Sequence, residues 1–377
     1  MEFSNWSIPE GISFDIVIAK LPLKRKFRTS FGEAYGTRVF LLSRADECIG
    51  IGEAPVDPYP LYSGEFVESV VEFAKKVLPE VKAQDTVSGM YNVLRKYRGN
   101  NFAKAMIEYS ILTLVSCLTN TSLVKAVGGR PFALPVQESI GIVDSVDELL
   151  KWAEEAISWG ARRLKVKIEP GWDVEPVKAL SREFPGVPIL ADANGSFSPL
   201  KDSHWEILSE VAQYVNSIEQ PFPPGDLVNS AKLSYEEAIE VTLDESVTSP
   251  NNVVELATLN EEMGSFLSFN LKPPRMGGLM ESLKSVELAQ QYDIPLFIGG
   301  SLETAVGRSL NMVVASTVSK NLEPSDFSPD QYFYERSLAK DPFDIECGFV
   351  RLRDGIGVMF DIDIDYLMSR AIEKISM

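Results

Sequence analysis

Histidine and cysteine are scarce in this chain of 377 residues, which has one histidine and three cysteines. The single histidine, His204, falls in a helix-like stretch (SPLKDSHWEILSEV), away from every predicted strand end. A zinc site of the usual kind, which needs several histidine or cysteine ligands, is therefore not expected. Cys48, Cys117 and Cys347 are widely separated, and no two of them form a CxxC pair. This odd, sparse set predicts free thiols in a reducing cytoplasm, with Cys117 in the core.

Basic residues are also in short supply, since 36 lysines and arginines face 54 acids and the formal net charge is −18. Nucleic acids and anionic membranes bind basic surfaces, so we expect neither as a partner. No apolar run is long enough to span a membrane, and the N-terminal segment MEFSNWSIPEGISFD lacks the pattern of a secretion signal. These absences predict a soluble, cytoplasmic protein.

Five acid-base residues recur at nearly equal steps through the second half of the chain. They are Lys167, Asp192, Glu219, Asp244 and Lys272, separated by 25, 27, 25 and 28 residues. Each ends a short apolar run rich in β-branched residues, and helical patterns separate the runs. Because one strand plus one helix takes about 25 to 30 residues, the repeat predicts a parallel α/β barrel. In such barrels the C-terminal strand ends converge on one rim, where active sites are built.

The chain length suits one barrel of about 250 residues with a smaller partner domain. We predict a modified TIM barrel, (β/α)7β, over residues 129–344, after a break at the sequence GGRP (128–131). Its first strand is expected in ALPVQESIG (133–141) and its seventh in IPLFIGGSLE (294–303). A short, irregular eighth is expected in LEPSDFSPD (322–330).

Residues 1–128 predict an N-terminal α+β capping domain. Strands are expected at 13–20, 38–45 and 47–54, and helices at 65–83, 86–98 and 102–118. Two polar loops with aromatic residues, 26–36 and 54–65, interrupt this part of the chain. The C-terminal segment 345–377, with a predicted hairpin and short helix in 349–367, cannot extend a closed barrel. We therefore place it on the capping domain.

Three carboxylates at successive strand ends predict a divalent-metal site formed by Asp192, Glu219 and Asp244. Carboxylate oxygens suit Mg2+, for which Mn2+ can substitute, and such a site keeps positions for water and substrate. A single acid at a strand end more often caps the helix that follows it. That explanation fails for three acids in consecutive units.

Lysines surround the predicted metal site. Lys165 and Lys167 lie two residues apart on one strand, so both side chains point the same way, into the barrel mouth. Lys272 approaches from across the barrel mouth. Together with Arg275, the three lysines make the mouth positive, which suits a carboxylate substrate. A lysine buried beside a metal ion and other cations loses its proton more readily and can act as a base. The site is thus suited to abstracting an α-proton and stabilising the resulting enediolate.

Longer motifs carry a family resemblance. LKVKIEPGWD, ADAN, SIEQP, LDES, NLKPPRMGGL and GGSLETAVGR, in this order, resemble the barrel of the enolase superfamily, in its muconate lactonising subgroup. FRTSFGEAYGTR, GIGEAP and PLYSGE resemble its capping domain, so the resemblance spans nearly the full chain. KIEPGWD, DLVNSAKL and the lysine-x-x-arginine arrangement at 272–275 are similar to the o-succinylbenzoate synthase/N-succinylamino acid racemase family. Ser301 stands where that family often has methionine, and this departure leaves the substrate open.

The resemblance implies a role for each motif residue. Lys167 would remove the α-proton and, in the synthase reaction, protonate the departing hydroxide on the same face. Lys272 would steady the enediolate, or act as the opposite-face acid/base in a racemase, while Lys165 would assist the bound carboxylate. The other implied site residues are Asn194 and Glu245, as partners of the metal ligands, and Arg275, Ser139, Gly300, Ser301, Phe31 and Tyr62, as substrate-binding residues.

The expected activity is that of an o-succinylbenzoate synthase, a magnesium-dependent lyase of menaquinone biosynthesis. It would dehydrate 2-succinyl-6-hydroxy-2,4-cyclohexadiene-1-carboxylate with syn geometry. Racemisation of N-succinyl or N-acyl amino acids is the main alternative, and one pocket could support both reactions. Dipeptide epimerisation and muconate cycloisomerisation stay open, as does assembly into a homo-oligomer. A Schiff-base aldolase would leave the three carboxylates unexplained, and a non-catalytic binding barrel would leave every catalytic position occupied without a use.

Overall fold

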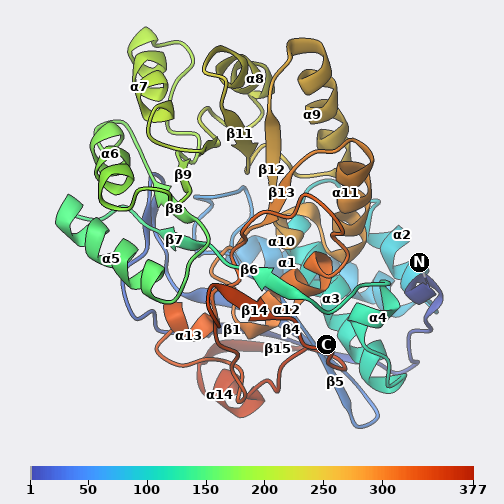
Figure 1. The fold of residues 1–377 in the computed structure, drawn as a ribbon. Helices are drawn as coiled ribbons and strands as arrows, with labels where there is room; N and C mark the ends of the chain where they lie inside the picture. The colour runs from blue at the N-terminus through green and yellow to red at the C-terminus, as the bar shows by residue number, and fades with distance from the viewer. Residues whose placement is uncertain (1) are drawn as a thin grey trace.

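The computed structural model describes residues 2–377 and contains an antiparallel sheet packed beside a parallel barrel (Figure 1). The antiparallel sheet has the order β15-β1-β4-β5. Its strands are β1 (Ser13–Lys20), β4 (Thr37–Ala45), β5 (Cys48–Ala54) and β15 (Ala371–Ser376). The three N-terminal strands expected from the sequence are confirmed to within one residue. Two very short strands, β2 (Arg28–Thr29) and β3 (Gly32–Glu33), form a small hairpin within the loop 26–36.

The C-terminal strand β15 returns to this sheet, where it pairs antiparallel with β1 and Ile375 lies opposite Ile16. The predicted return of the C-terminal segment is therefore confirmed, but the predicted hairpin within 349–367 is wrong. Instead, β14 (Phe349–Arg351) pairs with the distant β6 (Ala133–Pro135). The pairing partner of β14 thus lies far away in the sequence. Helix α14 (Ile364–Ser369) follows β14 and leads on to β15.

The three helices expected from the sequence are present: α1 (Val67–Lys82), α2 (Val87–Leu94) and α3 (Asn101–Leu118). Helices α1 and α3 lie against the antiparallel sheet, and α2 packs on both of them. Strand β5 lies directly on α3, because Gly50 and Gly52 have no side chains in the way. A Cβ atom at Gly50 would lie 2.1 Å from the carbonyl oxygen of Ser110, and one at Gly52 would lie 2.0 Å from that of Met106. Helix α3 is consequently buried along almost all of its length.

The close contact between β5 and α3 corrects the prediction of free thiols. Cys48, the first residue of β5, forms a disulfide with Cys117 in the last turn of α3, and their Cα atoms are 5.9 Å apart. The two residues are 69 positions apart in the sequence, so only the packing of strand on helix brings them together. Cys347 is exposed and outside any disulfide. The cysteine content therefore gives no support to the predicted cytoplasmic location.

The barrel sheet has seven parallel strands that follow one another in space as they do in sequence. They are β7 (Glu138–Ile140), β8 (Leu164–Lys167), β9 (Ile189–Asp192), β10 (Ser217–Glu219), β11 (Glu240–Leu243), β12 (Leu267–Leu271) and β13 (Leu296–Ile298). The helices between and after them are α5 (Val146–Ser158), α6 (Val174–Glu183), α7 (Asp202–Ala212), α8 (Leu227–Glu236), α9 (Pro250–Met263), α11 (Leu279–Gln291) and α12 (Ala305–Ala315). This alternation confirms the predicted β/α repeat.

The irregular segment 321–326 closes the sheet by bonding to both of its edges. The N–H of Glu323 donates to the carbonyl of Leu296 in β13 (2.9 Å). The N–H of Ser325 donates to the carbonyl of Pro135 (3.0 Å), and Gln137 donates back to Ser325 (3.0 Å). The predicted irregular eighth element is therefore confirmed. Short helices complete the chain: the 3-10 helix Glu2–Asn5, α4 (Leu123–Ala126), α10 (Pro273–Met276) and α13 (Asp330–Phe333).

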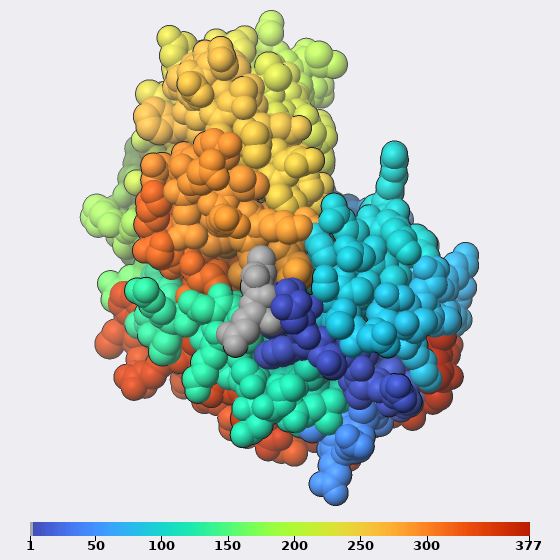
Figure 2. Space-filling view, turned by 90° about the vertical axis from the view of Figure 1, so that its right-hand side faces the viewer, coloured from blue at the N-terminus to red at the C-terminus, as the bar shows by residue number. Residues whose placement is uncertain are grey.

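Two buried glutamates of the capping domain hold the N-termini of two barrel helices. Glu53 of β5 accepts hydrogen bonds from the backbone of Thr304 (3.1 Å) and Gly307 (2.9 Å) at the start of α12. Glu108 of α3 accepts from Leu279 at the start of α11. Figure 2 shows the cyan capping helices lying directly against the orange residues of the barrel. Across residues 2–377, no helix combines the length and the apolar character that crossing a membrane requires.

Candidate active site

Strand register brings the five periodic residues to one end of the barrel. Lys167 lies opposite Asp192, and Asp192 lies opposite Glu219, on three neighbouring strands. Asp244 and Lys272 directly follow the last residues of β11 and β12. All five side chains are buried. Five consecutive strands therefore present one acid or base each at their C-terminal ends.

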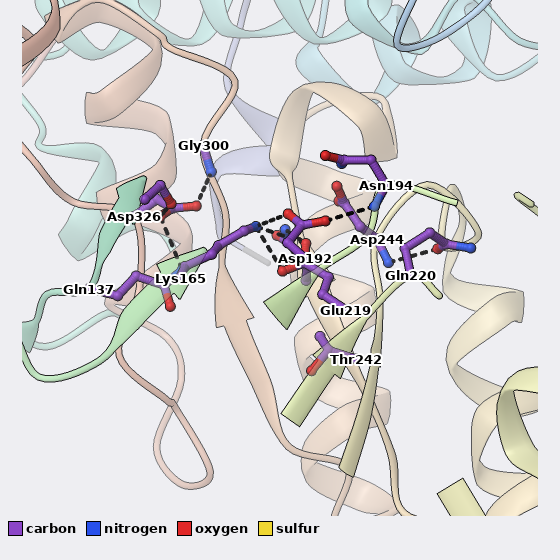
Figure 3. A network of polar contacts seen from close by, with 12 residues as sticks. Gln137, Lys165, Asp192, Asn194, Glu219, Gln220, Thr242, Asp244, Gly300 and Asp326 are labelled. Carbon is purple, nitrogen blue, oxygen red and sulfur yellow. Dashed lines mark hydrogen bonds and ion pairs between the residues drawn. The ribbon is translucent and has the colours of Figure 1, made fainter. Parts of the chain in front are cut away.

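Lys165 and Lys167 are paired with the carboxylates of the next two strands. Figure 3 shows Lys165 reaching toward Asp192 and Glu219. The Nζ atom of Lys165 lies 2.9 Å from Oδ2 of Asp192 and 2.7 Å from Oε2 of Glu219. The Nζ atom of Lys167 lies 2.6 Å from the same oxygen of Asp192. The two lysines therefore share one carboxylate, as expected for side chains that point the same way from one strand.

A second ion-pair cluster forms around Asp244, on the other side of the mouth. Nζ of Lys272 lies 3.0 Å from its Oδ2, and the guanidinium of Arg275 contacts its Oδ1. The hydroxyl of Tyr62, from the loop 54–65, accepts a hydrogen bond from Arg275 (2.7 Å) and lies 3.2 Å from Asp244. Phe31 of the loop 26–36 packs on Tyr62, with ring centroids 5.8 Å apart. Both loops therefore reach the site.

The buried charges shift one another's protonation. Burial disfavours the charged form of Lys165, but the attraction of Asp192 and Glu219 outweighs it and raises the pKa of this lysine well above its ordinary value. Burial and the neighbouring Asp192 raise the pKa of Glu219 to about 7. For Asp244, Arg275 and Lys272 together outweigh burial and hold its pKa well below the usual range. Of the carboxylates of Asp192, Glu219 and Asp244, that of Asp244 is therefore the most strongly held in its ionised form.

The donor chemistry of the three carboxylates fits a hard divalent cation. Asp192, Glu219 and Asp244 are fully buried, and Oε2 of Glu219 lacks a well-aligned hydrogen-bond donor, its contact with Lys165 being an ion pair at 2.7 Å. Oε2 of the neighbouring Glu245 also lacks a donor. Within residues 2–377, however, no set of acids, histidines or cysteines is drawn together as a ready cation cage, and lysines bridge the carboxylates instead. Cation binding at these oxygens would therefore require the lysine ammonium groups to move aside.

Two residues with left-handed backbone brace the strand ends behind the carboxylates. Gln220 has φ +38°, and its Oε1 accepts from the backbone N–H of Asp244 (3.1 Å) and Ser246 (3.2 Å). Asn194 has φ +44°, and its Nδ2 donates to Glu245 (2.9 Å). Strained backbone of this kind is often found where a site needs a fixed geometry. Gln220 and Asn194, each of which follows a predicted metal ligand, are thus hydrogen-bonded to the turn that carries Asp244.

One cavity unites the lysines with both capping loops and the rim. It is lined by Lys165, Lys167, Lys272, Asn194, Ser139, Gly300, Ser301, Phe31 and Tyr62, together with Arg38, Asp57, Leu302, Asp326 and aromatic residues of the loops. All of the predicted substrate-binding residues except Arg275 are thus on its wall. Arg275 lies behind Tyr62 and donates to the carbonyl oxygens of Val247 and Asn270.

Several polar residues of this site were not predicted from the sequence. Asp326, in the closing segment, accepts hydrogen bonds from Ser139 (2.8 Å), Gln137 (3.0 Å) and the N–H of Gly300 (2.9 Å). Asn270 donates to Glu219 (2.8 Å). Asn270 could have been found, because it precedes Lys272 by two positions on the same strand face. His204 lies apart from these residues, on α7, where its Nδ1 accepts from the N–H of Ser198 (2.8 Å).

Comparison with known proteins places this site in a family. Residues 148–366 match the family model described as enolase C-terminal domain-like. The chain is 34% identical to an N-succinylamino acid racemase of Thermus thermophilus, with 94% of this chain and 95% of the relative covered. It is 31% identical to an o-succinylbenzoate synthase of Geobacillus kaustophilus, with 94% of each covered. A solved structure from Listeria innocua, described as a member of the enolase superfamily, aligns with a TM-score of 0.88 and 27% identity, and the alignment covers 97% of this chain and 98% of that one.

The chain therefore belongs to the enolase superfamily, with a capping domain and a parallel barrel, and it is an enzyme. Relatives that align over nearly its whole length are named o-succinylbenzoate synthase or N-succinylamino acid racemase. Enzymes of this superfamily generally use a divalent metal ion.

Proposed function

We propose that this enzyme is an o-succinylbenzoate synthase, which removes water from 2-succinyl-6-hydroxy-2,4-cyclohexadiene-1-carboxylate. The observation that carries the proton-abstraction chemistry is the pair of buried lysines, Lys167 and Lys272, which line one cavity and form ion pairs with Asp192 and Asp244. The lysines end β8 and follow β12, four strands apart, so they approach the cavity from different sides. Five of the named relatives are o-succinylbenzoate synthases at 29 to 32% identity, which supports the same choice.

Lys167 is the proposed base. Its Nζ would accept the α-proton of the substrate carboxylate and then give a proton to the departing hydroxide on the same face, so that one C–H and one C–O bond break and water leaves. Lys165 would stay protonated, because its pKa is raised by Asp192 and Glu219, and would hold the substrate carboxylate electrostatically. Lys272 would stabilise the negative charge from the other side.

Asp192, Glu219 and Asp244 would hold a magnesium ion, with manganese as a substitute. When bound, the cation would stabilise the negative charge that grows on the substrate carboxylate as the α-proton leaves. Asn194 and Glu245 would keep the ligands in place through the hydrogen bond between them. Tyr62 and Phe31 would exclude water from above.

N-succinylamino acid racemisation is a second candidate, and the position of Lys272 favours it. A racemase needs an acid/base on each face of the α-carbon, and Lys272 can supply the second one. The identity of 34% to a relative named N-succinylamino acid racemase points the same way. One cavity with two lysines could serve both reactions.

Two substrates given to the same protein separate the candidates. With magnesium present, the synthase substrate should be dehydrated, and EDTA should abolish the reaction. An N-succinyl amino acid in D2O should show inversion and α-deuterium incorporation only if the enzyme is also a racemase. Dehydration without racemisation supports the synthase, and racemisation without dehydration overturns it in favour of the racemase. Turnover that survives EDTA would contradict the proposed metal site.

Control variants make the comparison sharper. Lys272→Ala should abolish inversion of the amino acid, because the second face then lacks its acid/base. Lys151→Ala, an exposed lysine on α5, should change neither reaction. If Lys272→Ala leaves racemisation intact, Lys272 is not the second acid/base.

A further inference from the structure

The loop 299–303, which follows β13, forms part of the cavity wall and is held in an unusual conformation. Leu302 has φ +53°, in the left-handed region that residues with a side chain rarely adopt. Gly299 packs so closely on Asn270 that a Cβ atom would lie 1.8 Å from its Oδ1. Such a conformation persists only where its surroundings hold it.

Arg38, on β4 of the capping domain, supplies much of that hold. Its Nε and Nη2 donate to the carbonyl of Leu302 (3.3 and 3.2 Å), and Nη2 also donates to the carbonyl of Ser301 (3.3 Å). The hydroxyl of Tyr334 donates to the same Leu302 carbonyl (2.6 Å). Arg38 and Tyr334 therefore fix the two peptides that place Ser301 and Leu302 on the cavity wall.

The same guanidinium contacts the capping loops. Nη1 of Arg38 lies 3.4 Å from Oδ1 of Asp57, in the loop 54–65. That oxygen also accepts from the N–H of Tyr35 (3.2 Å), in the loop 26–36. One carboxylate thus joins both loops to Arg38, and Arg38 joins them to the loop 299–303. Three segments of the cavity wall meet at a single side chain.

Arg38 is buried, so water does not compete for its hydrogen bonds and ion pairs. Arg38 is 2% exposed, and Glu53 lies 3.9 Å from its Nε. A buried guanidinium is tolerated when carboxylates and carbonyls satisfy its donors, as they do here. Its planar fork reaches several acceptors at fixed angles, which a lysine ammonium cannot match.

We propose that Arg38 is a positioning residue for substrate recognition, which ties the two capping loops to the loop 299–303 and so fixes the wall of the substrate cavity. The inference rests on the proposed function only in that it takes this cavity as the substrate site. Within residues 2–377, the hydrogen bonds and ion pairs of Arg38 go to Thr37, Glu53, Asp57, Ser301 and Leu302 and not to the lysines, so Arg38 acts through the wall of the cavity. Loss of its fork should therefore weaken substrate binding much more than it slows the chemical step.

The test compares Arg38→Lys with Arg44→Lys in the magnesium-loaded enzyme. Arg44 lies on the same strand, where it pairs at the half-buried surface with Asp15, 3.5 Å away. Arg38→Lys should raise KM about tenfold, the loss expected for hydrogen bonds of this kind, with kcat within about twofold. Arg44→Lys should change neither. Tyr334→Phe, which removes one donor to Leu302 and keeps the ring, should give a smaller rise in KM.

Hydrogen–deuterium exchange gives a readout that does not depend on turnover. Backbone amides of 299–304 and 54–62 should exchange faster in Arg38→Lys than in wild type, and not in Arg44→Lys. Unchanged exchange in both segments overturns the proposal, as does a fall in kcat at constant KM or faster exchange with unchanged KM. If wild type converts neither proposed substrate, the proposed function fails, whereas the exchange result still shows whether Arg38 holds the loops of the cavity wall.

Discussion

The side-chain oxygen of Gln220 accepts a hydrogen bond from the backbone N–H of Asp244, 3.1 Å away, so the residue after one predicted metal ligand holds the next ligand in place. The same side chain donates to the carbonyl of Phe222 and contacts the hydroxyl of Ser246, each at 2.8 Å. Gln220 is fully buried. One amide therefore ties the ends of β10 and β11 together behind the carboxylates.

Replacing Gln220 with methionine should weaken metal binding. The substitution keeps the side-chain volume nearly constant but leaves the N–H groups of Asp244 and Ser246 without their acceptor. Changes in residues that support metal ligands typically cost about 10- to 100-fold in affinity, and we expect a loss in that range for magnesium. Isothermal titration calorimetry measures it directly.

Asn260→Leu is the matched control for this loss. Asn260 makes comparable hydrogen bonds to Leu267 and Ser265, but at the opposite end of the barrel, where β12 begins. Asn260→Leu should lower the unfolding temperature and leave the magnesium Kd unchanged. Equal effects of the two variants on Kd would show that Gln220 matters only for general stability.

Glu108 should make the protein less stable as the pH rises. Burial raises its pKa to about 8, above the ordinary value of 4.5. Between these two values the folded state retains a proton that the unfolded state has lost, so the free energy of unfolding falls as the pH increases. At about 1.4 kcal/mol per pKa unit, the full effect amounts to a few kcal/mol. Glu108→Gln should therefore flatten the decline, which urea unfolding at about pH 5 and about pH 8.5 measures.

Glu68→Gln, at an exposed position on α1, is the control for the removal of a carboxyl group. It should leave the pH profile of wild type intact. A profile of Glu108→Gln as steep as that of wild type would mean that Glu108 is ionised throughout this range.

The disulfide between Cys48 and Cys117 should contribute strongly to stability. It closes a loop across 69 positions, for which loop-closure entropy gives about 4 kcal/mol. The double variant Cys48→Ser/Cys117→Ser should lose stability of this order in urea unfolding, and wild type in reductant should behave like it. Cys347→Ser, which changes the exposed thiol, should match wild type. Three free thiols in the unfolded, unreduced protein would show that the disulfide does not form.

Much of the fold could be predicted because it rests on a repeated local pattern. The sequence of each β/α unit contains an apolar run, a polar strand end and a helical stretch. Strands β8 to β12 could therefore be predicted one by one. The disulfide, and the pairing of β14 with β6, join residues far apart in the sequence. Neither leaves a local signal, because only the packed structure brings the partners together.

The candidate site could be predicted to a similar extent as the fold. Charged residues at strand ends stand out against apolar runs, and Lys167 and Asp192 were found in this way. Arg38, Gln220 and Asp326 act through hydrogen bonds to backbone or to other side chains, and their identities alone predict no such contacts. Lys165 shows a further limit, because the sequence predicts only a supporting role toward a bound carboxylate, whereas in the structure its nearest partners are the carboxylates of Asp192 and Glu219, which raise its pKa.

The measurement that tests the central claim most directly is the rate of α-proton removal in Lys167→Ala. We would follow magnesium-dependent conversion of the substrate that wild type uses, with Lys151→Ala as the control. General-base catalysis contributes about 100- to 10,000-fold, so Lys167→Ala should be slower than wild type by at least about 100-fold. It should nevertheless keep its fold and bind magnesium at least as tightly as wild type, because an ammonium group that competes for Asp192 is removed. A variant that removes the α-proton at nearly the wild-type rate would contradict the account, because another group would then be the base.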